Sequence, residues 1–251
     1  MENYVFLKKR LIKNQRESEF SVLNFDDEIV KNFYTETKAK VVWVSRKQEV
    51  DGAYIKDNKI YFKGEYITDV DKSPLSGEHN EYNLLFAVAS AKIIGVSNIA
   101  ISKGIEEFKG IPHRIELVKE KDGVRYYNDS KATNTASTIS ALKCMQKPTV
   151  LVLGGSDKGE DYTALFESVK NSLVIHTVLT GNTRFNMLEK AKQIGLENVT
   201  LTGDFELAIK IAKMNCFEGC NLLLSPGAAS FDKFNSFEER GDCFKKIVED
   251  F

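Results

Sequence analysis

The segment from Arg125 to Asn134 gathers several side chains that could carry chemistry. Aromatic and β-branched residues at 124–127 predict a strand that leads into it, and apolar residues at helical spacing in 135–143 predict a helix after it. The polar residues between them would form a loop at the carboxyl end of a strand, where open α/β sheets bind ligands and a following helix attracts anions. Asp129 offers a carboxylate for a ribose, a cation or a metal-bound water, and Lys131 offers an ammonium for phosphate or carboxylate. Taken alone, the segment is better explained as a turn capped by Asn and Ser than as a site.

Three further segments follow apolar stretches and would reach the same edge of a parallel sheet: 154–159, 180–182 and 225–232. The first has two glycines, which allow close backbone approach, and the cation Lys158. It matches neither a Walker A loop nor a GxGxxG fingerprint. A simple turn explains the second segment better than a site does. The third leads to Ser230, whose hydroxyl could hold a carboxylate. A nucleophilic serine is the alternative, but the GxSxG elbow is absent and no histidine follows in the chain.

The three histidines are dispersed, which argues against a histidine-rich metal site. His176 lies in an apolar strand and is predicted to be a core residue. His113 precedes Arg114 at a predicted domain boundary, where ligands often lie. Asn80 and Asn83 are three residues apart and would share a helix face, from which their amides could read a base edge, whereas capping would explain only one of them.

The elements that would position these residues form two regions. Residues 1–112 read as an amphipathic helix over 1–15, strands, a hairpin turning at Asp57-Asn58, and two helices. After Gly110 and Pro112, strands alternate with helices, which predicts a mostly parallel, doubly wound Rossmann-like α/β sheet in 113–251. The expected strands are 124–128, 149–153, 174–180 and 221–225, and the expected helices include 163–169, 204–214 and a closing helix through 244–251.

Composition narrows the classes of function. The chain has 251 residues, of which 42% are hydrophobic and 28% charged, and its net charge is −1. Such a balance gives no basic surplus for nucleic acid or for an anionic membrane. Apolar runs are far shorter than the roughly 20 residues of a bilayer span, and the N-terminus lacks a signal-peptide pattern, so a cytoplasmic protein is expected. Four cysteines without paired CxxC spacing predict reduced thiols.

Together these segments resemble the Mur ligase family. The segments His113-Arg114, 128–134, 154–159, 225–232 and 237–241 occur in the family's order, and 76–83 is similar to its Ser-Gly-x-His-Asn-x-x-Asn motif. The run Ser-Lys-Ala-Thr-Asn resembles the D-glutamate-adding branch, the MurD ligases, rather than the branches that add L-alanine, a diamino acid or a terminal dipeptide. The resemblance covers essentially the whole chain.

The resemblance implies a role in peptidoglycan precursor synthesis. In that reaction ATP phosphorylates the carboxylate of UDP-N-acetylmuramoyl-L-alanine, and the amine of D-glutamate attacks the acyl phosphate. It implies nucleotide contacts from Asn80, Asn83, His113, Arg114, Asp129 and Lys131. Asp129 would lie near the ribose and Lys131 near the reacting phosphates, as the catalytic pair. The implied D-glutamate contacts are Thr133, Lys158, Ser230 and Phe237. These types suit a dicarboxylate, which needs cations and hydroxyl or N–H donors at both ends. Phe231 replaces an expected Leu.

The sequence departs from the family in one respect. The family has a UDP-binding domain, a central ATPase domain and a C-terminal Rossmann-like domain, but this chain contains no Gly-Lys-Thr/Ser phosphate loop. It also lacks the family's metal-binding Glu, its modified Lys and its Asp-His-Leu-Asp segment. The resemblance implies that ATP binds together with Mg²⁺, but no ligand of the metal is expected in this chain. We therefore expect 1–112 to be the rear of the central domain and 113–251 to be the C-terminal domain, with Met1 an internal methionine.

A chain of that kind is expected to lack turnover by itself, because the γ-phosphate would have no P-loop. The alternatives are a non-catalytic module that binds D-glutamate or nucleotide, or one half of a split ligase that complements the other. A nicotinamide-dependent dehydrogenase would rest on the strand–helix alternation alone and fails on the missing fingerprint. The incomplete sheet expected in 1–110 would leave apolar surface exposed and favour self-association.

Overall fold

The structure, a computed structural model, describes residues 2–75 and 77–251. Ser76 of the 76–83 motif and the side chain of Tyr4 lie outside the described residues. The chain divides into two compact units, 1–109 and 110–251, and each is described by itself. None of the helices described is long and apolar enough to cross a bilayer.

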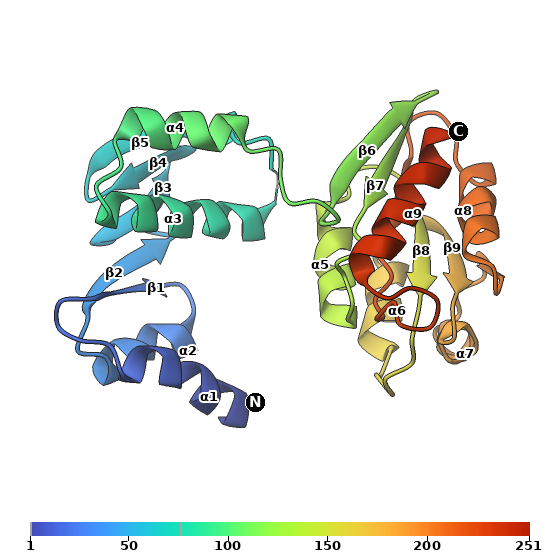
Figure 1. The fold of residues 1–251 in the computed structure, drawn as a ribbon, viewed down its shortest axis with the longest axis horizontal. Helices are drawn as coiled ribbons and strands as arrows, with labels where there is room; N and C mark the ends of the chain where they lie inside the picture. The colour runs from blue at the N-terminus through green and yellow to red at the C-terminus, as the bar shows by residue number, and fades with distance from the viewer. Residues whose placement is uncertain (1, 76) are drawn as a thin grey trace. The chain divides into compact units, whose positions relative to one another are not determined.

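The first unit contains a five-stranded sheet in the order β1-β2-β3-β4-β5 (Figure 1). Its elements are α1 (Glu2–Lys13), β1 (Phe20–Asn24), α2 (Glu28–Lys31), η1 (Asn32–Glu36), β2 (Lys40–Ser45), β3 (Gly52–Lys56), β4 (Lys59–Phe62), β5 (Glu65–Asp69), η2 (Val70–Lys72), α3 (Glu78–Ile93) and α4 (Asn98–Glu107). Strands β1 to β3 are parallel, whereas β3 to β5 form antiparallel hairpins. The predicted turn at Asp57-Asn58 is confirmed, and both residues have positive φ, as a two-residue hairpin turn requires.

The predicted N-terminal helix is present as α1, but much of its apolar face is not buried. Leu11 is 75% exposed and Leu7 is half exposed. The core of this unit lies instead between the sheet and helices α3 and α4, around Val44, Ile60 and Leu85. Part of the apolar face of α1 is therefore exposed in the first unit.

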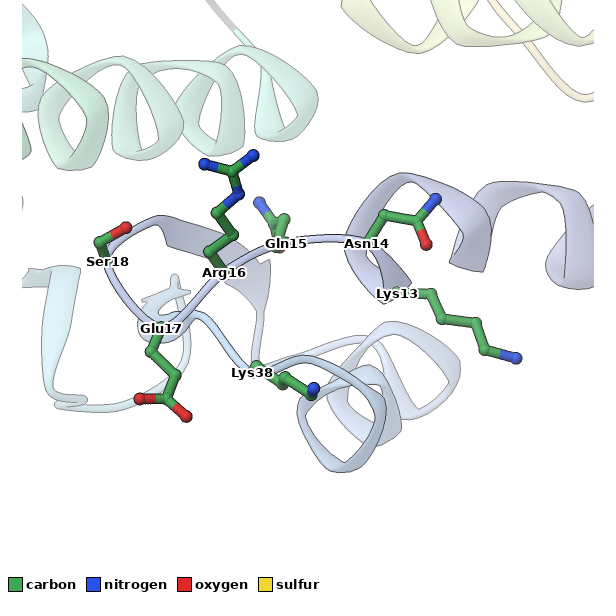
Figure 2. A pocket seen from close by; sticks show the side chains of 7 residues that line it. All are labelled: Lys13, Asn14, Gln15, Arg16, Glu17, Ser18 and Lys38. Atoms are coloured by element: carbon green, nitrogen blue, oxygen red, sulfur yellow. The ribbon is translucent and has the colours of Figure 1, made fainter.

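A polar pocket lies beside the turn between α1 and β1 (Figure 2). It is lined by Lys13, Asn14, Gln15, Arg16, Glu17, Ser18 and Lys38. The Arg16 guanidinium points away from the Lys13 and Lys38 side chains (Figure 2). The cations therefore do not converge on one point, and this pocket has no counterpart among the predicted site residues.

The second unit is a six-stranded sheet in the order β10-β9-β8-β11-β7-β6 (Figure 1). Its elements are β6 (Glu116–Lys121), β7 (Val124–Asn128), α5 (Thr135–Cys144), β8 (Thr149–Gly154), α6 (Thr163–Lys170), β9 (Val174–Thr180), α7 (Arg184–Ile194), β10 (Val199–Leu201), α8 (Phe205–Met214), β11 (Asn221–Leu224) and α9 (Phe237–Glu249). Only β6 is antiparallel to its neighbour, so the predicted mostly parallel sheet is confirmed.

Alternating side chains of the central strand β8 reach opposite faces of this sheet, as strand geometry requires. Val150 and Val152 join the core formed with α8 and α9. Leu151 and Leu153 join the core formed with α5, α6 and α7. Both faces are covered, as expected of parallel sheets, and this leaves the strand ends free to carry a site.

Candidate functional site

Four parallel strands end at one edge of the second sheet. Strand β11 pairs with β7 and β8 on its two sides, and β8 pairs with β9. The loops that follow these strands therefore share one edge, as the sequence predicts. They carry the segments 129–134, 155–159, 181–183 and 225–232.

Asp129 is buried in the first of these loops. Its side chain is 4% exposed, and its two carboxylate oxygens accept from the Ile115 N–H at 3.2 Å and from the Ser225 hydroxyl at 2.6 Å. Burial raises the pKa of Asp129 to about 6, although these two hydrogen bonds and the charge of Arg114 oppose the rise. Asp129 therefore ties the end of β7 to the β11 loop and to the start of the unit.

This pKa gives a testable pH dependence. Because the folded pKa is raised from 3.8, the stability contributed by protonated Asp129 is fully present below about pH 3.8 and is lost as pH rises through about 6. Asp129→Asn should remove this pH-dependent loss, because an amide does not ionise. As pH rises from 4 to 7, the free energy of unfolding of the variant should therefore increase by on the order of 2–3 kcal/mol relative to that of the wild type. Denaturant unfolding of both proteins across this range measures the difference. A difference that does not change with pH would contradict the assignment.

Backbone strain brackets Arg114. His113 and Ile115 have φ of +63° and +47°, and a β-branched residue rarely adopts this region. The Lys131 N–H donates to the His113 carbonyl at 3.0 Å, and the Ile115 N–H is held by Asp129. Each strained residue costs about 1–3 kcal/mol, which these contacts offset, and Arg114 between them is exposed. These hydrogen bonds thus fix the backbone on both sides of the exposed Arg114.

The His113 ring is buried against β7 and α9. Its Nδ1 lies 3.0 Å from Asn128 Nδ2, an amide donor, so Nδ1 accepts and the proton is assigned to Nε2. The ring also makes an edge contact with Phe237, at 6.2 Å between centroids. Gly241 leaves room for it, since a Cβ there would lie 2.1 Å from Nδ1. In this structure the His113 side chain therefore has a structural role, because it packs between β7 and α9.

Arg240 is the residue whose importance the sequence analysis missed. Its guanidinium is 2% exposed and donates to the Ser130 hydroxyl and carbonyl at 3.0 and 2.9 Å. It also donates to the carbonyls of Ala228 and Ala229 at 3.1 and 3.2 Å. Burial lowers the pKa of Arg240 to about 10, so it stays charged at neutral pH. The available signal was its position one turn before Phe244 on the apolar face of an amphipathic helix.

The candidate ligand-binding cations are exposed at this edge. Lys131 places its ammonium 4.8 Å from the centroid of the Phe237 ring. Lys158 is exposed in the loop after β8, where the Asp157 carboxylate accepts from the Gly159 N–H at 2.8 Å. Thr133 is half-buried directly after the Lys131 turn. These residues could hold an anionic ligand with two separated negative groups.

A backbone hydrogen bond joins two of the predicted segments. The Ser156 N–H donates to the Ala229 carbonyl at 2.7 Å, so the loop that carries Lys158 is paired with the loop that carries Ser230. Ser230 itself is buried next to this bridge. The structure therefore brings these two predicted segments into direct contact.

Two predicted site residues belong to the first unit. Asn80 and Asn83 lie on α3, and the Asn83 amide donates to the Asn80 side-chain oxygen at 3.3 Å. They share a helix face as predicted.

His176, predicted to lie in the core, is only half-buried, and its Nε2 lies 2.8 Å from the Thr200 hydroxyl. Its polar partner Thr200 belongs to β10, a strand that the sequence did not predict and that pairs with β9.

The described residues include no group of three or more His, Cys, Asp or Glu side chains that could hold a metal ion. The four cysteines are free thiols. The chemistry that this edge offers is therefore that of cations, hydroxyls and backbone donors.

Comparison with known proteins gives two family matches. The model described as "Mur ligase middle domain" matches residues 1–91, and the one described as "Mur ligase, glutamate ligase domain" matches residues 113–227. UDP-N-acetylmuramoylalanine--D-glutamate ligase of Latilactobacillus sakei is 41% identical over 249 residues, which cover 99% of this chain and 55% of that protein. The enzyme of the same name from Thermoanaerobacter sp. (strain X514) is 40% identical over 98% of this chain and 56% of its own length. The chain thus spans a little over half the length of these curated relatives.

Solved structures agree on the fold. MurF from Acinetobacter baumannii has a TM-score of 0.73 at 16% identity, covering 99% of this chain and 55% of that one. The MurF ligase from Thermotoga maritima in complex with ADP has a TM-score of 0.66 at 18% identity, covering 99% and 58%. At these identities the likeness concerns the arrangement of the elements alone.

Proposed function

The chain belongs to the Mur ligase family, and from this premise we propose that it supplies the D-glutamate-binding part of a UDP-N-acetylmuramoyl-L-alanine:D-glutamate ligase. The proposed reaction consumes ATP and forms an amide bond through an acyl phosphate. In this proposal 1–112 is the rear of the middle domain and 113–251 is the glutamate ligase domain. The proposed substrates are ATP and a UDP-linked sugar, so the reaction would take place in the cytoplasm.

The hydrogen bond between Ser156 and Ala229 carries the proposal for D-glutamate. It sets the loop of Lys158 against the loop of Ser230 at one sheet edge, which supports the proposal that an ammonium and a hydroxyl act on one ligand. D-glutamate has two carboxylates, and charge-assisted hydrogen bonds to each would fix its orientation. Thr133, in the loop after β7, and Phe237, at the start of α9, complete the proposed pocket.

The nucleotide part of the proposal rests on exposed cations. Arg114 and Lys131 are exposed on the two segments that Asp129 ties together, and they suit the phosphates of ATP. Both carboxylate oxygens of Asp129 already accept hydrogen bonds, so in our proposal it mainly holds this loop in place beside the ribose. His113 would act by supporting the same loop. Asn80 and Asn83, on α3 of the first unit, are proposed separately as nucleotide contacts of that unit.

The described residues do not fit a Mg²⁺ site. They contain no group of three or more His, Cys, Asp or Glu side chains that could hold a metal ion, and the buried Asp129 is committed to internal partners. Mg²⁺ needs several oxygen ligands in near-octahedral arrangement. The described residues are therefore given no metal-binding role in the proposed reaction.

Lys158→Met tests the D-glutamate proposal. Removing the ammonium while keeping the length of the side chain should weaken D-glutamate binding by about 10- to 100-fold, which corresponds to the loss of one charge-assisted contact. Isothermal titration of the chain with D-glutamate measures this. Lys143→Met, on the exposed last turn of α5, is the matched control and should bind like the wild type. Equal affinities of the wild type and Lys158→Met for D-glutamate would show that Lys158 does not contribute to D-glutamate binding.

The absence of a Gly-Lys-Thr/Ser loop from the 251 residues favours a second candidate, a module that binds D-glutamate or nucleotide without turnover, alone or as one half of a split ligase. Under either reading the chain alone should release no ADP above background from ATP, UDP-N-acetylmuramoyl-L-alanine and D-glutamate. Steady ADP release by the purified chain would contradict both. ADP release that appears only when a polypeptide carrying a Mur ligase P-loop is added would favour the split ligase.

A further inference from the structure

We propose that Asp232 is a positioning residue that latches the turn after Ser230 onto the end of strand β9. This inference rests on the proposed D-glutamate function of Ser230. It also gives a role to the segment Thr180-Gly181-Asn182, for which the sequence analysis favoured a simple turn.

The latch begins with the geometry of the turn. The Ser230 carbonyl accepts from the N–H groups of Lys233 and Phe234, at 3.2 and 2.9 Å, so residues 230–234 form one tight turn. Within it the Asp232 carboxylate accepts from the Asn182 N–H at 3.1 Å. A side chain thus closes the contact between two loops that follow different strands.

Gly181 shows how closely this carboxylate fits. A Cβ at Gly181 would lie 2.5 Å from Asp232 Oδ2, and the residue has φ of +70°. Glycine adopts this conformation without strain and leaves space for the oxygen. A Cβ there would also lie 2.6 Å from the Gly155 nitrogen, so the backbone at the end of β9 leaves room both for the Asp232 carboxylate and for the loop after β8.

Two further anchors hold the same turn. The Lys233 ammonium donates to the Gly203 carbonyl, in the loop after β10. The Phe234 ring packs edge-on against Phe205 at the start of α8, at 5.1 Å between centroids. Asp232 also favours the charged form of the buried Arg240, which binds the chain just before the turn. Three consecutive side chains thus fasten the turn to three other loops or helices.

Ser230 and Phe231 are the first two residues of the turn that these anchors hold. Ser230 is buried, whereas Phe231 is 70% exposed although its neighbours on the C-terminal side are anchored. The anchors restrict the backbone of both residues, and preorganised groups bind a ligand at a lower entropic cost. Asp232 would therefore raise the affinity for D-glutamate through Ser230, without touching the ligand.

The test compares Asp232→Ala with Asp232→Asn in the full 251-residue chain. The Asn side chain keeps an oxygen that can accept from Asn182, so D-glutamate binding should stay within about threefold of the wild type. Asp232→Ala removes the acceptor and should weaken binding about tenfold or more. It should also speed hydrogen exchange of the Asn182 amide, with the rest of the second sheet still protected. Asp250→Ala, an exposed carboxylate at the end of α9, is the matched control.

The outcomes separate this inference from the proposed function. Unchanged D-glutamate affinity in Asp232→Ala overturns the positioning role, and so does an equal loss in Asp232→Asn and Asp232→Ala. If the wild type itself does not bind D-glutamate, the proposed function of this edge fails. Exchange of the Asn182 amide then decides the latch, which stands if exchange accelerates in Asp232→Ala and falls if it does not.

Discussion

Replacing Arg240 with methionine should lower the free energy of unfolding of the second unit by about 2–4 kcal/mol. Methionine fills much of the same volume, but it leaves the carbonyls of Ser130 and Ala228 buried without their donor, and it leaves the Ala229 carbonyl with the Ser156 N–H alone. Methionine carries no charge, so the variant avoids the free-energy cost of burying a guanidinium, but this gain offsets only part of the loss. The carbonyl acceptors stay buried in the variant and cannot bond to water instead. Arg240→Lys should recover little, since one ammonium cannot reproduce the planar fork that reaches two loops.

Urea unfolding followed by amide signals from residues 110–251 measures this effect separately from the first unit. Arg125→Met is the matched control. Arg125 is partly exposed and pairs with Glu120 at 2.9 Å on the surface, so its loss should cost less than about 1 kcal/mol. Equal effects of the two substitutions would mean that the Arg240 hydrogen bonds do not hold the loops together.

Gly241→Ala should destabilise the second unit by about 1–3 kcal/mol or more, because the added methyl group would overlap the His113 ring. The ring cannot move easily, since Asn128 and Phe237 hold it on two sides. Adding His113→Ala to Gly241→Ala removes the overlap. The double variant should therefore be more stable than the sum of the single effects predicts, by about 1 kcal/mol or more in a double-mutant cycle.

Gly104→Ala is the control for this series. Gly104 lies in α4, and a Cβ there would meet no atom within 4 Å. Alanine at this position should be neutral or should stabilise the first unit by up to about 1 kcal/mol. Additive effects of Gly241→Ala and His113→Ala would contradict the steric account.

The sequence predicted the regular elements where apolar residues are periodic. Strands β7, β8, β9 and β11 and their parallel order follow from short apolar runs separated by helical patterns, and all four are present. Strand β6 was missed because Glu116–Lys121 is largely charged and pairs at the edge of the sheet, where burial does not impose an apolar pattern. Strand β10 was missed because only three residues form it.

The start of α9 was also missed. The sequence analysis placed a helix around Phe244, whereas α9 begins at Phe237 behind the cap Ser236, whose hydroxyl accepts from the Glu239 N–H. The first turn is polar, so apolar periodicity could not reveal it, although Ser followed three residues later by Glu is a capping signal. This difference places Phe237 and Arg240 on one rigid helix.

The candidate site was partly predictable. The strand ends could be predicted to share an edge, because parallel topology requires it. The burial of Asp129 and His113 could not, since both are polar residues whose partners come from distant segments: Ser225 for Asp129, and Gly241 for His113. The latch at Asp232 depends in the same way on a contact with Asn182, fifty residues away along the chain.

The central claim is that the sheet edge of residues 110–251 binds D-glutamate. A titration of the isotope-labelled 251-residue chain with D-glutamate and, separately, with L-glutamate tests it most directly by NMR. The account predicts saturable shifts of the amide signals of Thr133, Lys158 and Ser230 with D-glutamate, and at least about tenfold weaker binding of L-glutamate. Absence of shifts at these residues, or equal affinity for the two enantiomers, would contradict it.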